Sequence, residues 1–455
     1  MTSRLSLLAT LLLVGAGAPR AANAPIARIA LVGGMVLDGY GGEPLHKATI
    51  LIEGNRIVAV GPESTMRIPP GTQIIDTRGK TMLPGLIELH AHLLLVGDGD
   101  IPRWFKWLEA HRTQYSYERV MELSARQLLA AGITSAVDLG APLNESVRVR
   151  ERIRAGKIPG PRLSISGPWL ISAAAIFPPD CQLIVTTPAE AARATEDNIR
   201  GGADVIKAQG GLTFDEYKAI VEVAHRHNVK VNAHLYSEQS VRDAFTAGVD
   251  ILQHVGSAGT PPYSHSLVMA IAGSNRPVVP TAAHRVWVLP ATRAFPERLS
   301  DPALEDEFPP DMWAELQSSF ADVDALDYFR NHEQEESNGD SSIQQWIQAG
   351  AVIGMGSDNG SPLNFHRDAL WREAKVFVDH GMPAAQVISA LTWVNAKILG
   401  SDRELGTLEP GKLADIAVVS GDPLFDIVAL SNVDLVIKDG VAYRNGSRVA
   451  RDHSR

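Results

Sequence analysis

The chain has 455 residues, of which 45% are hydrophobic and 21% charged, and this balance is typical of a soluble globular protein. Its formal net charge of −10 argues against a nucleic-acid-binding surface. The single cysteine, Cys181, excludes an intrachain disulfide and a structural zinc site built from cysteines. The length suits a barrel of about 250 or more residues together with a smaller domain.

The first 24 residues differ from the rest of the chain. Arg4 supplies a positive charge, residues 5–16 form an apolar run, and A-N-A at 22–24 ends it with a small-x-small pattern. This arrangement is typical of a secretory signal peptide and is too short to span a membrane. We therefore expect a periplasmic or secreted protein that has no membrane insertion once the signal peptide, residues 1–24, is removed.

Residues 25–80 have the pattern of short strands separated by turns, without a helical period. Strand-like runs such as A-T-I-L-I-E (48–53) are bounded by glycine-containing turns. The same pattern returns in residues 401–455, for example in L-A-D-I-A-V-V-S (413–420). We predict one small β-sandwich domain assembled from both termini.

Residues 81–400 alternate between strand-like and helical segments. The run from Met82 to Leu95, opened by Pro84-Gly85, reads as a buried strand. Seven further strand-like segments follow at 133–140, 162–168, 203–209, 229–235, 250–255, 277–282 and 351–358. Helical patterns lie between most of them, for example at 116–131, 213–227 and 238–247. Eight alternating strands predict the α/β class and a (β/α)8 TIM-like barrel.

The segment 285–345 is too long for a single crossover and is unusually acidic, with E-D-E at 305–307 and three glutamates within 333–336. A decorated crossover helix and a lid over the barrel mouth both fit this segment. We favour the decorated crossover.

Metal-binding residue types fall at the predicted carboxyl ends of the strands, where the active sites of TIM barrels lie. His90 and His92 are two apart on one strand, so their side chains point to the same face. Two buried imidazoles are costly unless they bind something, and hydrogen-bonded core histidines are the alternative to a metal site. Lys207, His234, His254 and Asp358 lie near the ends of the fourth, fifth, sixth and eighth strands. The six residues together predict a metal centre.

Six motifs carry a resemblance to a known family. They are L-P-G-L-I-E-L-H-A-H (83–92), G-A-D-V-I-K (202–207), V-N-A-H-L (231–235), A-G-V-D-I-L-Q-H-V (247–255), G-S-D (356–358) and L-G-T-L-E-P-G-K-L-A-D-I-A-V-V (405–419). In this combination the chain resembles the metal-dependent amidohydrolase superfamily, and most closely its imidazolonepropionase-like and Xaa-Pro-dipeptidase-like branch.

The resemblance implies a centre of two divalent metal ions. Its ligands would be His90, His92 and Asp358 for one ion, His234 and His254 for the other, and Lys207, carbamylated by CO2, as a bridge between them. A single metal beside an unmodified Lys207 is the alternative. Zinc is the expected metal for imidazole and carboxylate ligands, although Mn, Co or Fe would suit the same donors. Asp358 would also be the catalytic residue, taking a proton from water and passing it to the leaving amine.

We predict an exported amidohydrolase that cleaves the amide bond of an N-acyl amino acid or of a dipeptide with a free carboxylate. Tyr236, His284 and Arg285 lie near the expected rim as candidate substrate contacts, and Arg285 could pair a carboxylate. The alternatives are a mononuclear cyclic-amide hydrolase or deaminase and, from another class, a non-catalytic binding protein. The expected partner is a small-molecule substrate, and a homo-oligomer is compatible with the resemblance.

Overall fold

The computed structural model describes residues 27–256 and 262–449. The predicted signal peptide lies outside this part of the chain and stays a prediction. Within the described residues, no helix is both long and apolar enough to cross a membrane.

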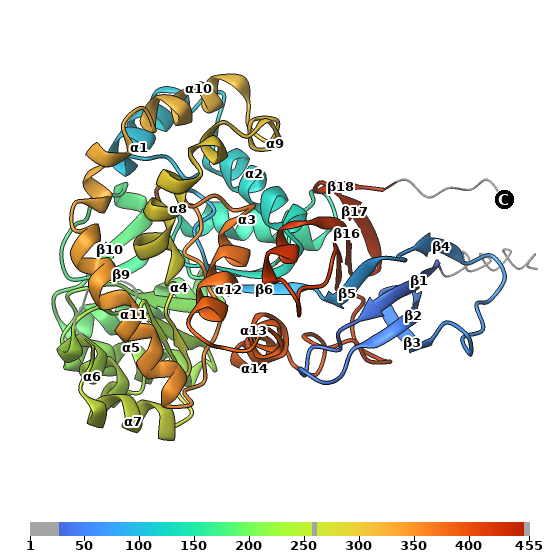
Figure 1. Cartoon of the computed structure of the whole chain (residues 1–455). Coiled ribbons are helices and arrows are strands. Elements are labelled where there is room, and N and C mark those ends of the chain that lie inside the picture. Colours follow the sequence, from blue (N-terminus) through green and yellow to red (C-terminus); the bar gives the residue numbers. More distant parts are fainter. Residues whose placement is uncertain (1–26, 257–261, 450–455) are drawn as a thin grey trace, which may run out of the picture.

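One nine-stranded sheet at the side of the barrel joins the two ends of the chain (Figure 1). Its strands are β1 (Arg28–Val36), β2 (Leu45–Glu53), β3 (Arg56–Pro62), β4 (Gln73–Asp76), β5 (Lys80–Pro84), β15 (Ile416–Ser420), β16 (Val433–Lys438), β17 (Val441–Arg444) and β18 (Ser447–Arg448). Their order is β18-β17-β16-β15-β5-β1-β2-β3, and β4 pairs with β1. The two halves meet where β15 pairs antiparallel with β5, with Ala417 opposite Leu83.

Apolar side chains from both halves of this sheet form one core. Leu31 and Ile50 from the N-terminal half and Ile416 and Ile437 from the C-terminal half are all 0% exposed and belong to the same cluster. Branched aliphatic side chains suit the pleated, half-buried surface of a strand. The prediction of a small β domain built from both termini is confirmed.

The run from Met82 to Leu95 is not one strand, as the sequence suggested. It divides at Gly85 into β5, which belongs to the small sheet, and β6 (Leu86–Ala91), which opens the barrel. Only glycine fits at this point, because a Cβ on Gly85 would lie 2.2 Å from the hydroxyl oxygen of Thr134. Residues 81–84, which we had assigned to the barrel, therefore pair in the small domain.

Parallel strands form the barrel wall. They are β6, β7 (Ile133–Asp138) and β8 (Arg162–Ile165) in one ladder, and β9 (Trp169–Ile171), β10 (Gln182–Ile184), β11 (Val205–Ala208), β12 (Lys230–His234), β13 (Ile251–Gln253) and β14 (Val278–Val279) in another, ordered β10-β9-β11-β12-β13-β14. A backbone hydrogen bond from Asp204 to Ile165 links the two ladders.

The expected eighth strand, 351–358, is irregular. It makes isolated bridges to both neighbours, Ile353 with Val278 of β14 and Asn359 with Ala91 of β6. Asp358 has a φ of +53°, a left-handed conformation that interrupts a regular strand. The (β/α)8 arrangement predicted from the sequence is therefore present, but its last position is an extended segment with a turn at the site.

Helices surround these strands (Figure 1). They are α1 (Ile101–Ala110), α2 (Tyr117–Ala130), α3 (Leu143–Arg154), α4 (Pro188–Arg200), α5 (Phe214–Arg226), α6 (Glu238–Ala247), α7 (His265–Gly273), α8 (Val288–Ala294), α9 (Pro302–Glu305), α10 (Pro310–Ser319), α11 (His332–Gln348), α12 (Ala369–Asp379), α13 (Ala384–Ser389) and α14 (Asn395–Leu399). The helical segments predicted at 116–131, 213–227 and 238–247 correspond to α2, α5 and α6. Ser116, Thr213 and Ser237 cap their N-termini by accepting backbone hydrogen bonds.

The acidic segment 285–345 is a helical excursion that contains α8 to α11 and returns to the barrel through α11. It agrees with the decorated crossover that we favoured. The segment also brings Tyr328 and Glu335 against Arg285, as described below, so it contributes to the rim of the site.

Candidate active site and metal centre

The six residues predicted as metal ligands gather at the carboxyl ends of the barrel strands. Nε2 of His92 lies 2.9 Å, and Nε2 of His90 3.4 Å, from Oδ1 of Asp358. The ring of His254 has its centroid 4.5 Å from that of His90 and 4.2 Å from that of His234. Strands far apart in the sequence therefore bring four imidazoles and one carboxylate together.

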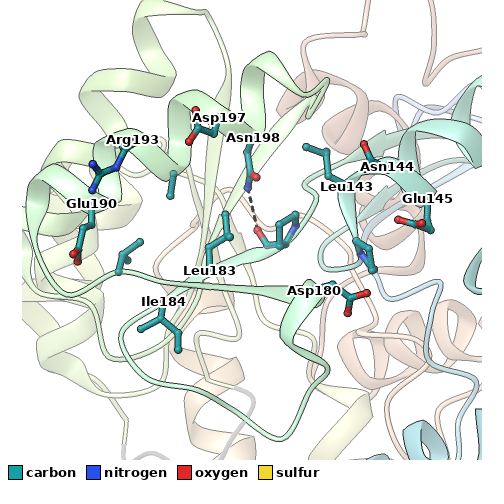
Figure 2. A pocket seen from close by; sticks show the side chains of 14 residues that line it. Leu143, Asn144, Glu145, Asp180, Leu183, Ile184, Glu190, Arg193, Asp197 and Asn198 are labelled. Carbon is teal, nitrogen blue, oxygen red and sulfur yellow. Dashed lines mark hydrogen bonds between the residues drawn. The ribbon is translucent and has the colours of Figure 1, made fainter. Parts of the chain in front are cut away.

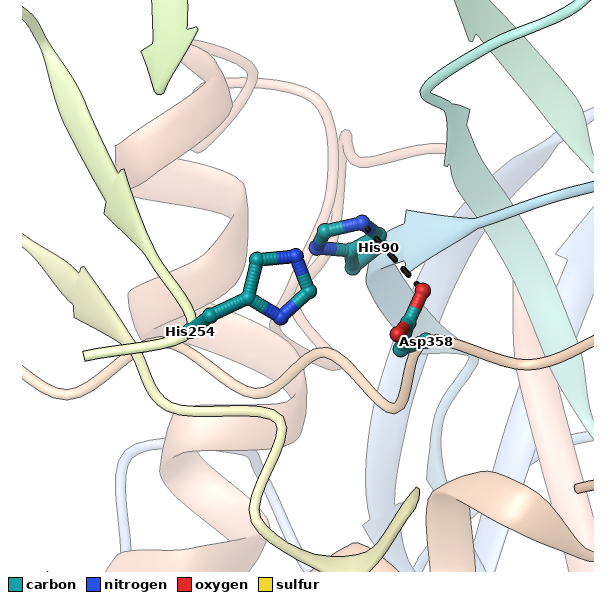
Figure 3. Close-up of side chains that lie close together, drawn as sticks. All are labelled: His90, His254 and Asp358. Carbon is teal, nitrogen blue, oxygen red and sulfur yellow. Dashed lines mark ion pairs between the residues drawn. The ribbon is translucent and has the colours of Figure 1, made fainter. Parts of the chain in front are cut away.

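Three of these side chains are close enough to share one cation. One ligand atom each from His90, His254 and Asp358 lies within 4.8 Å of the others, and Figure 3 shows the three side chains pointing toward one another. All three residues are buried. Imidazole nitrogens and a carboxylate oxygen are donors that zinc and related divalent metals prefer, so this donor set fits a metal ion.

Neighbouring polar groups fix the imidazoles in the tautomer that metal binding requires. Nδ1 of His90 donates to Oε1 of Gln253 at 2.9 Å, and the amide nitrogen of Gln253 donates in turn to Asn232. Nδ1 of His254 donates to the hydroxyl of Thr281 at 2.8 Å, because that hydroxyl gives its own proton to the carbonyl of Pro280. In both rings Nε2 therefore carries no proton, and its lone pair is available to a metal ion.

Burial and neighbouring charges set the protonation of this cluster. Burial lowers the pKa of His90 and His254 well below the usual range, which keeps their rings neutral and able to ligate a metal. Burial alone would raise the pKa of Asp358, but His284, His90 and His92 hold it well below its usual value. The carboxylate of Asp358 is therefore ionised, and burial keeps the rings of His90 and His254 neutral.

Lys207 lies inside the cluster rather than at its edge. Its side chain is 1% exposed, and Nζ is 3.2 Å from Nε2 of His90. Burial lowers the pKa of this amine to about 7, although the carboxylate of Asp358 opposes the shift. The amine is therefore substantially neutral near pH 7 and can act as a nucleophile.

Left-handed backbone conformations occur at three site positions that are not glycine. The φ angles are +64° at His254, +51° at Thr281 and +53° at Asp358. Such conformations cost about 1–3 kcal/mol each and persist where the surroundings impose them, often at functional sites. Here they occur at two candidate ligands, His254 and Asp358, and at Thr281, whose hydroxyl contacts His254.

A buried carboxylate, which we had not singled out, joins two segments that carry candidate ligands. Glu88 accepts hydrogen bonds from the backbone N–H groups of His90 at 2.8 Å and Ser357 at 2.9 Å. It also accepts from the Ser357 hydroxyl and from the side-chain amide of Asn359. Burial raises its pKa to about 7. Glu88 lies two residues before His90 on the same strand, so its side chain points to the same face. This spacing could have identified Glu88 as a site residue from the sequence.

The three predicted substrate contacts also lie at the barrel mouth. Nε2 of His284 is 3.1 Å from Oδ2 of Asp358. The ring of Tyr236 packs 4.6 Å, between centroids, from that of His234. Nε of Arg285 donates to both carboxylate oxygens of Glu335 at 2.9 Å, and its guanidinium lies 4.9 Å from the centroid of the Tyr328 ring. Tyr328 could not be found from the sequence, because the segment that holds it has no motif.

A cavity of about 760 Å³ lies away from this cluster (Figure 2). Its lining includes four carboxylates and a single arginine: Glu145, Asp180, Glu190, Asp197 and Arg193. Asn198 donates a hydrogen bond across it to the carbonyl of Pro168, drawn as a dashed line in Figure 2. None of the residues predicted as ligands or substrate contacts lines this cavity, so it is separate from the candidate active site.

Known proteins share this architecture. Residues 81–442 match the model of the Amidohydrolase family. The chain is 24% identical over 441 residues to 5-methylthioadenosine/S-adenosylhomocysteine deaminase of Symbiobacterium thermophilum, covering 89% of this chain and 88% of that protein. It is 24% identical over 415 residues to imidazolonepropionase of Thermoplasma acidophilum, covering 89% and 92%. A solved structure from Bifidobacterium longum, described provisionally as a prolidase, superposes with a TM-score of 0.71 and 28% sequence identity. The match covers 94% of this chain and 96% of that one.

The family model matches most of the chain and agrees with the motifs at the strand ends. The chain therefore belongs to the amidohydrolase family.

Proposed function

We propose that this protein hydrolyses the amide bond of an N-acyl amino acid or dipeptide with a free carboxylate, at a centre of two divalent metal ions. Membership of the amidohydrolase family makes it a hydrolase that acts on C–N bonds. The substrate, the number of metal ions and their identity as zinc are the parts that we propose. Export, inferred from residues 1–24, belongs to the same proposal.

The buried amine of Lys207 is the observation that carries the two-metal proposal. The side chain of Lys207 is 1% exposed, its Nζ lies 3.2 Å from Nε2 of His90, and burial lowers its pKa to about 7. In its neutral form the nitrogen can attack the carbon of CO2 and lose a proton, which gives a carbamate with two oxygen donors. His90, His92 and Asp358 would bind one ion and His234 and His254 the other, which would complete the ligand set. The chemistry supplied by divalent metals here would be Lewis acidity, which favours loss of a proton from water and polarises a carbonyl.

The residues of the chain itself account for the proton transfers. The carboxylate of Asp358 can take a proton from the attacking water and deliver it to the leaving amine. His284, 3.1 Å from that carboxylate, stabilises the ionised form. The guanidinium of Arg285, which Glu335 and Tyr328 hold at the rim, is the group that can receive the substrate carboxylate.

A mononuclear hydrolase or deaminase is the second candidate. It is favoured by the close grouping of His90, His254 and Asp358, which suffices for one ion without Lys207. Two of the relatives described above are named as a deaminase and an imidazolonepropionase, and either activity would use such a site.

Metal content and intact mass distinguish the two candidates. Protein purified with zinc and bicarbonate should contain two metals per chain and, under non-denaturing conditions, an added mass equal to that of CO2. The Lys207→Ala variant should lose the added mass and one metal. One metal, no added mass and full activity of Lys207→Ala would contradict the two-metal proposal and direct the screen toward cyclic amides and amidines.

A further inference from the structure

An aromatic cluster borders the candidate metal centre on the side away from Arg285. Trp169 lies edge-on to His92, with ring centroids 5.8 Å apart, and Phe177 packs against Trp169 at 4.3 Å. Phe105 of α1 continues the row 5.9 Å from Phe177. We call Trp169, Phe177 and Phe105 the aromatic wall.

The structure fixes the wall in place. The indole nitrogen of Trp169 donates to the carbonyl of Leu139, at the end of β7. The ring lies directly against Gly140, where a Cβ would meet the indole at 1.9 Å, so only glycine allows this position. The side chain of Gln182 holds the loop of Phe177, since it accepts from the N–H of Ala175 at 2.8 Å and donates to the carbonyl of Phe177 at 2.7 Å.

The loop that continues the wall is apolar although it faces solvent. Residues 166–179 contain no charged side chain. Within them, Ala173, Ala174 and Ala175 are exposed, and Ile176 is 62% exposed. In the wall itself Trp169 is buried, and Phe177 and Phe105 are partly buried. An exposed apolar run that is continuous with such a cluster is costly in water and often marks a binding surface. Its continuity with His92 through Trp169 indicates that the group bound there belongs to the substrate.

The wall and Arg285 lie at well-separated barrel positions. Trp169 sits between the ends of β7 and β11, through its bond to Leu139 and through the pairing of β9 with β11. Arg285 follows β14, three strands beyond β11 in the sheet order. A substrate with its carboxylate at Arg285 and its scissile amide at Asp358 would therefore extend its acyl group toward the wall.

We infer that the aromatic wall and Ile176 form an acyl subsite that selects substrates with a bulky apolar or aromatic acyl group. This inference rests on the proposed hydrolysis of N-acyl amino acids or dipeptides. It names the part of the substrate that this barrel mouth would recognise, which the proposed function leaves open.

The test is a comparison of acyl groups on one amino acid. The metal-loaded enzyme should hydrolyse the N-phenylacetyl derivative with a kcat/KM about 10–100-fold above that of the N-acetyl derivative, because a larger apolar group gains burial. Phe177→Ala should lower kcat/KM for the phenylacetyl substrate about tenfold, and Phe177→Leu should restore most of it. Ile176→Ser, at an exposed position where folding is not at risk, should give a smaller loss. Phe425→Ala, at a phenylalanine that is 92% exposed, is the matched control and should behave as the wild type.

Binding measured without turnover separates failure of the subsite from failure of the proposed function. Calorimetric titration of the same compounds into Asp358→Ala should show tighter binding of the phenylacetyl derivative, and addition of Phe177→Ala should remove the difference. Turnover that does not depend on acyl size would overturn the subsite and leave the hydrolase intact. Size-dependent binding without turnover in the wild type would overturn the hydrolase and support the subsite. Absence of both binding and turnover would overturn both.

Discussion

The core of the small β domain and the mouth of the barrel bury side chains of opposite character. The β-domain core consists of aliphatic residues from both ends of the chain, such as Ile50 and Ile416. The barrel mouth buries Glu88, Lys207 and Asp358 together with several histidines. Burial of apolar area stabilises a fold, whereas burial of charged groups costs free energy unless each is paired or bound. The difference indicates that the mouth is maintained for chemistry and the β domain for stability.

The largest expected effect separates activity from stability. Asp358→Ala should lower kcat about 10³-fold or more, because it removes the group that we propose transfers the proton. The fold should be retained, although the free energy of unfolding should fall because the contacts of Asp358 with His92 and His284 are lost. Steady-state kinetics and thermal unfolding measure both quantities. If the activity of Asp358→Ala were retained, Asp358 would not be the catalytic residue.

A substitution in the core of the β domain should lower stability and leave activity unchanged. Ile50→Ala removes a side chain that is 0% exposed on β2 and should lower the free energy of unfolding by about 2–5 kcal/mol. Activity per folded molecule should stay at the wild-type level, because Ile50 belongs to the core of the small β domain. Val58→Ala on the neighbouring strand, where the side chain is 39% exposed, serves as the control and should cost far less in urea unfolding.

Substitution of Glu88 tests whether one polar group in the mouth supports both the stability of the fold and the binding of metal. Glu88→Ala leaves the backbone N–H groups of His90 and Ser357 without their acceptor and should cost about 2–4 kcal/mol of stability. Because the same bonds hold His90 against the Asp358 segment, metal content should also fall. Glu88→Gln keeps one acceptor oxygen and should lose less stability and less metal than Glu88→Ala. A stable, fully metallated Glu88→Ala protein would show that this network does not position the ligands.

The smallest effect is a dependence of stability on pH. Glu373 accepts from the N–H groups of Ala282 and Ala283, and burial raises its pKa from 4.5 to about 8 despite these bonds. The folded state therefore holds this proton more tightly than the unfolded state. The resulting stability is complete below about pH 4.5 and is lost as the pH rises through about 8.

Glu373→Gln should remove this contribution. Between pH 5 and pH 8.5, the unfolding temperature of the wild type should fall relative to that of Glu373→Gln, because only the wild type loses this proton. Lys375→Ala on the exposed face of the same helix, α12, is the control and should leave the pH dependence unchanged. Parallel pH profiles of wild type and Glu373→Gln would show that Glu373 is not protonated in the folded protein.

Much of the barrel mouth could be predicted from the sequence because its residues follow strands. His90, His92, Lys207 and His234 each belong to a short apolar run, and parallel strands direct the residues at their carboxyl ends to one rim. Tyr328 and Trp169 could not be predicted in the same way. Tyr328 lies in the helical insertion 285–345, and Trp169 begins the short strand β9, which pairs with β11. The position of each depends on packing that no local pattern encodes.

The sequence by itself determined the barrel, the two-part β domain and which strands carry the candidate ligands, since hydrophobic periodicity and turn residues act locally. Only the tertiary structure decided the division at Gly85, the left-handed turn at Asp358 and the tautomers set by Gln253 and Thr281. It also decided that an aromatic wall stands beside His92. These features depend on contacts between segments far apart in the chain, and such contacts exist only after the barrel has closed around them.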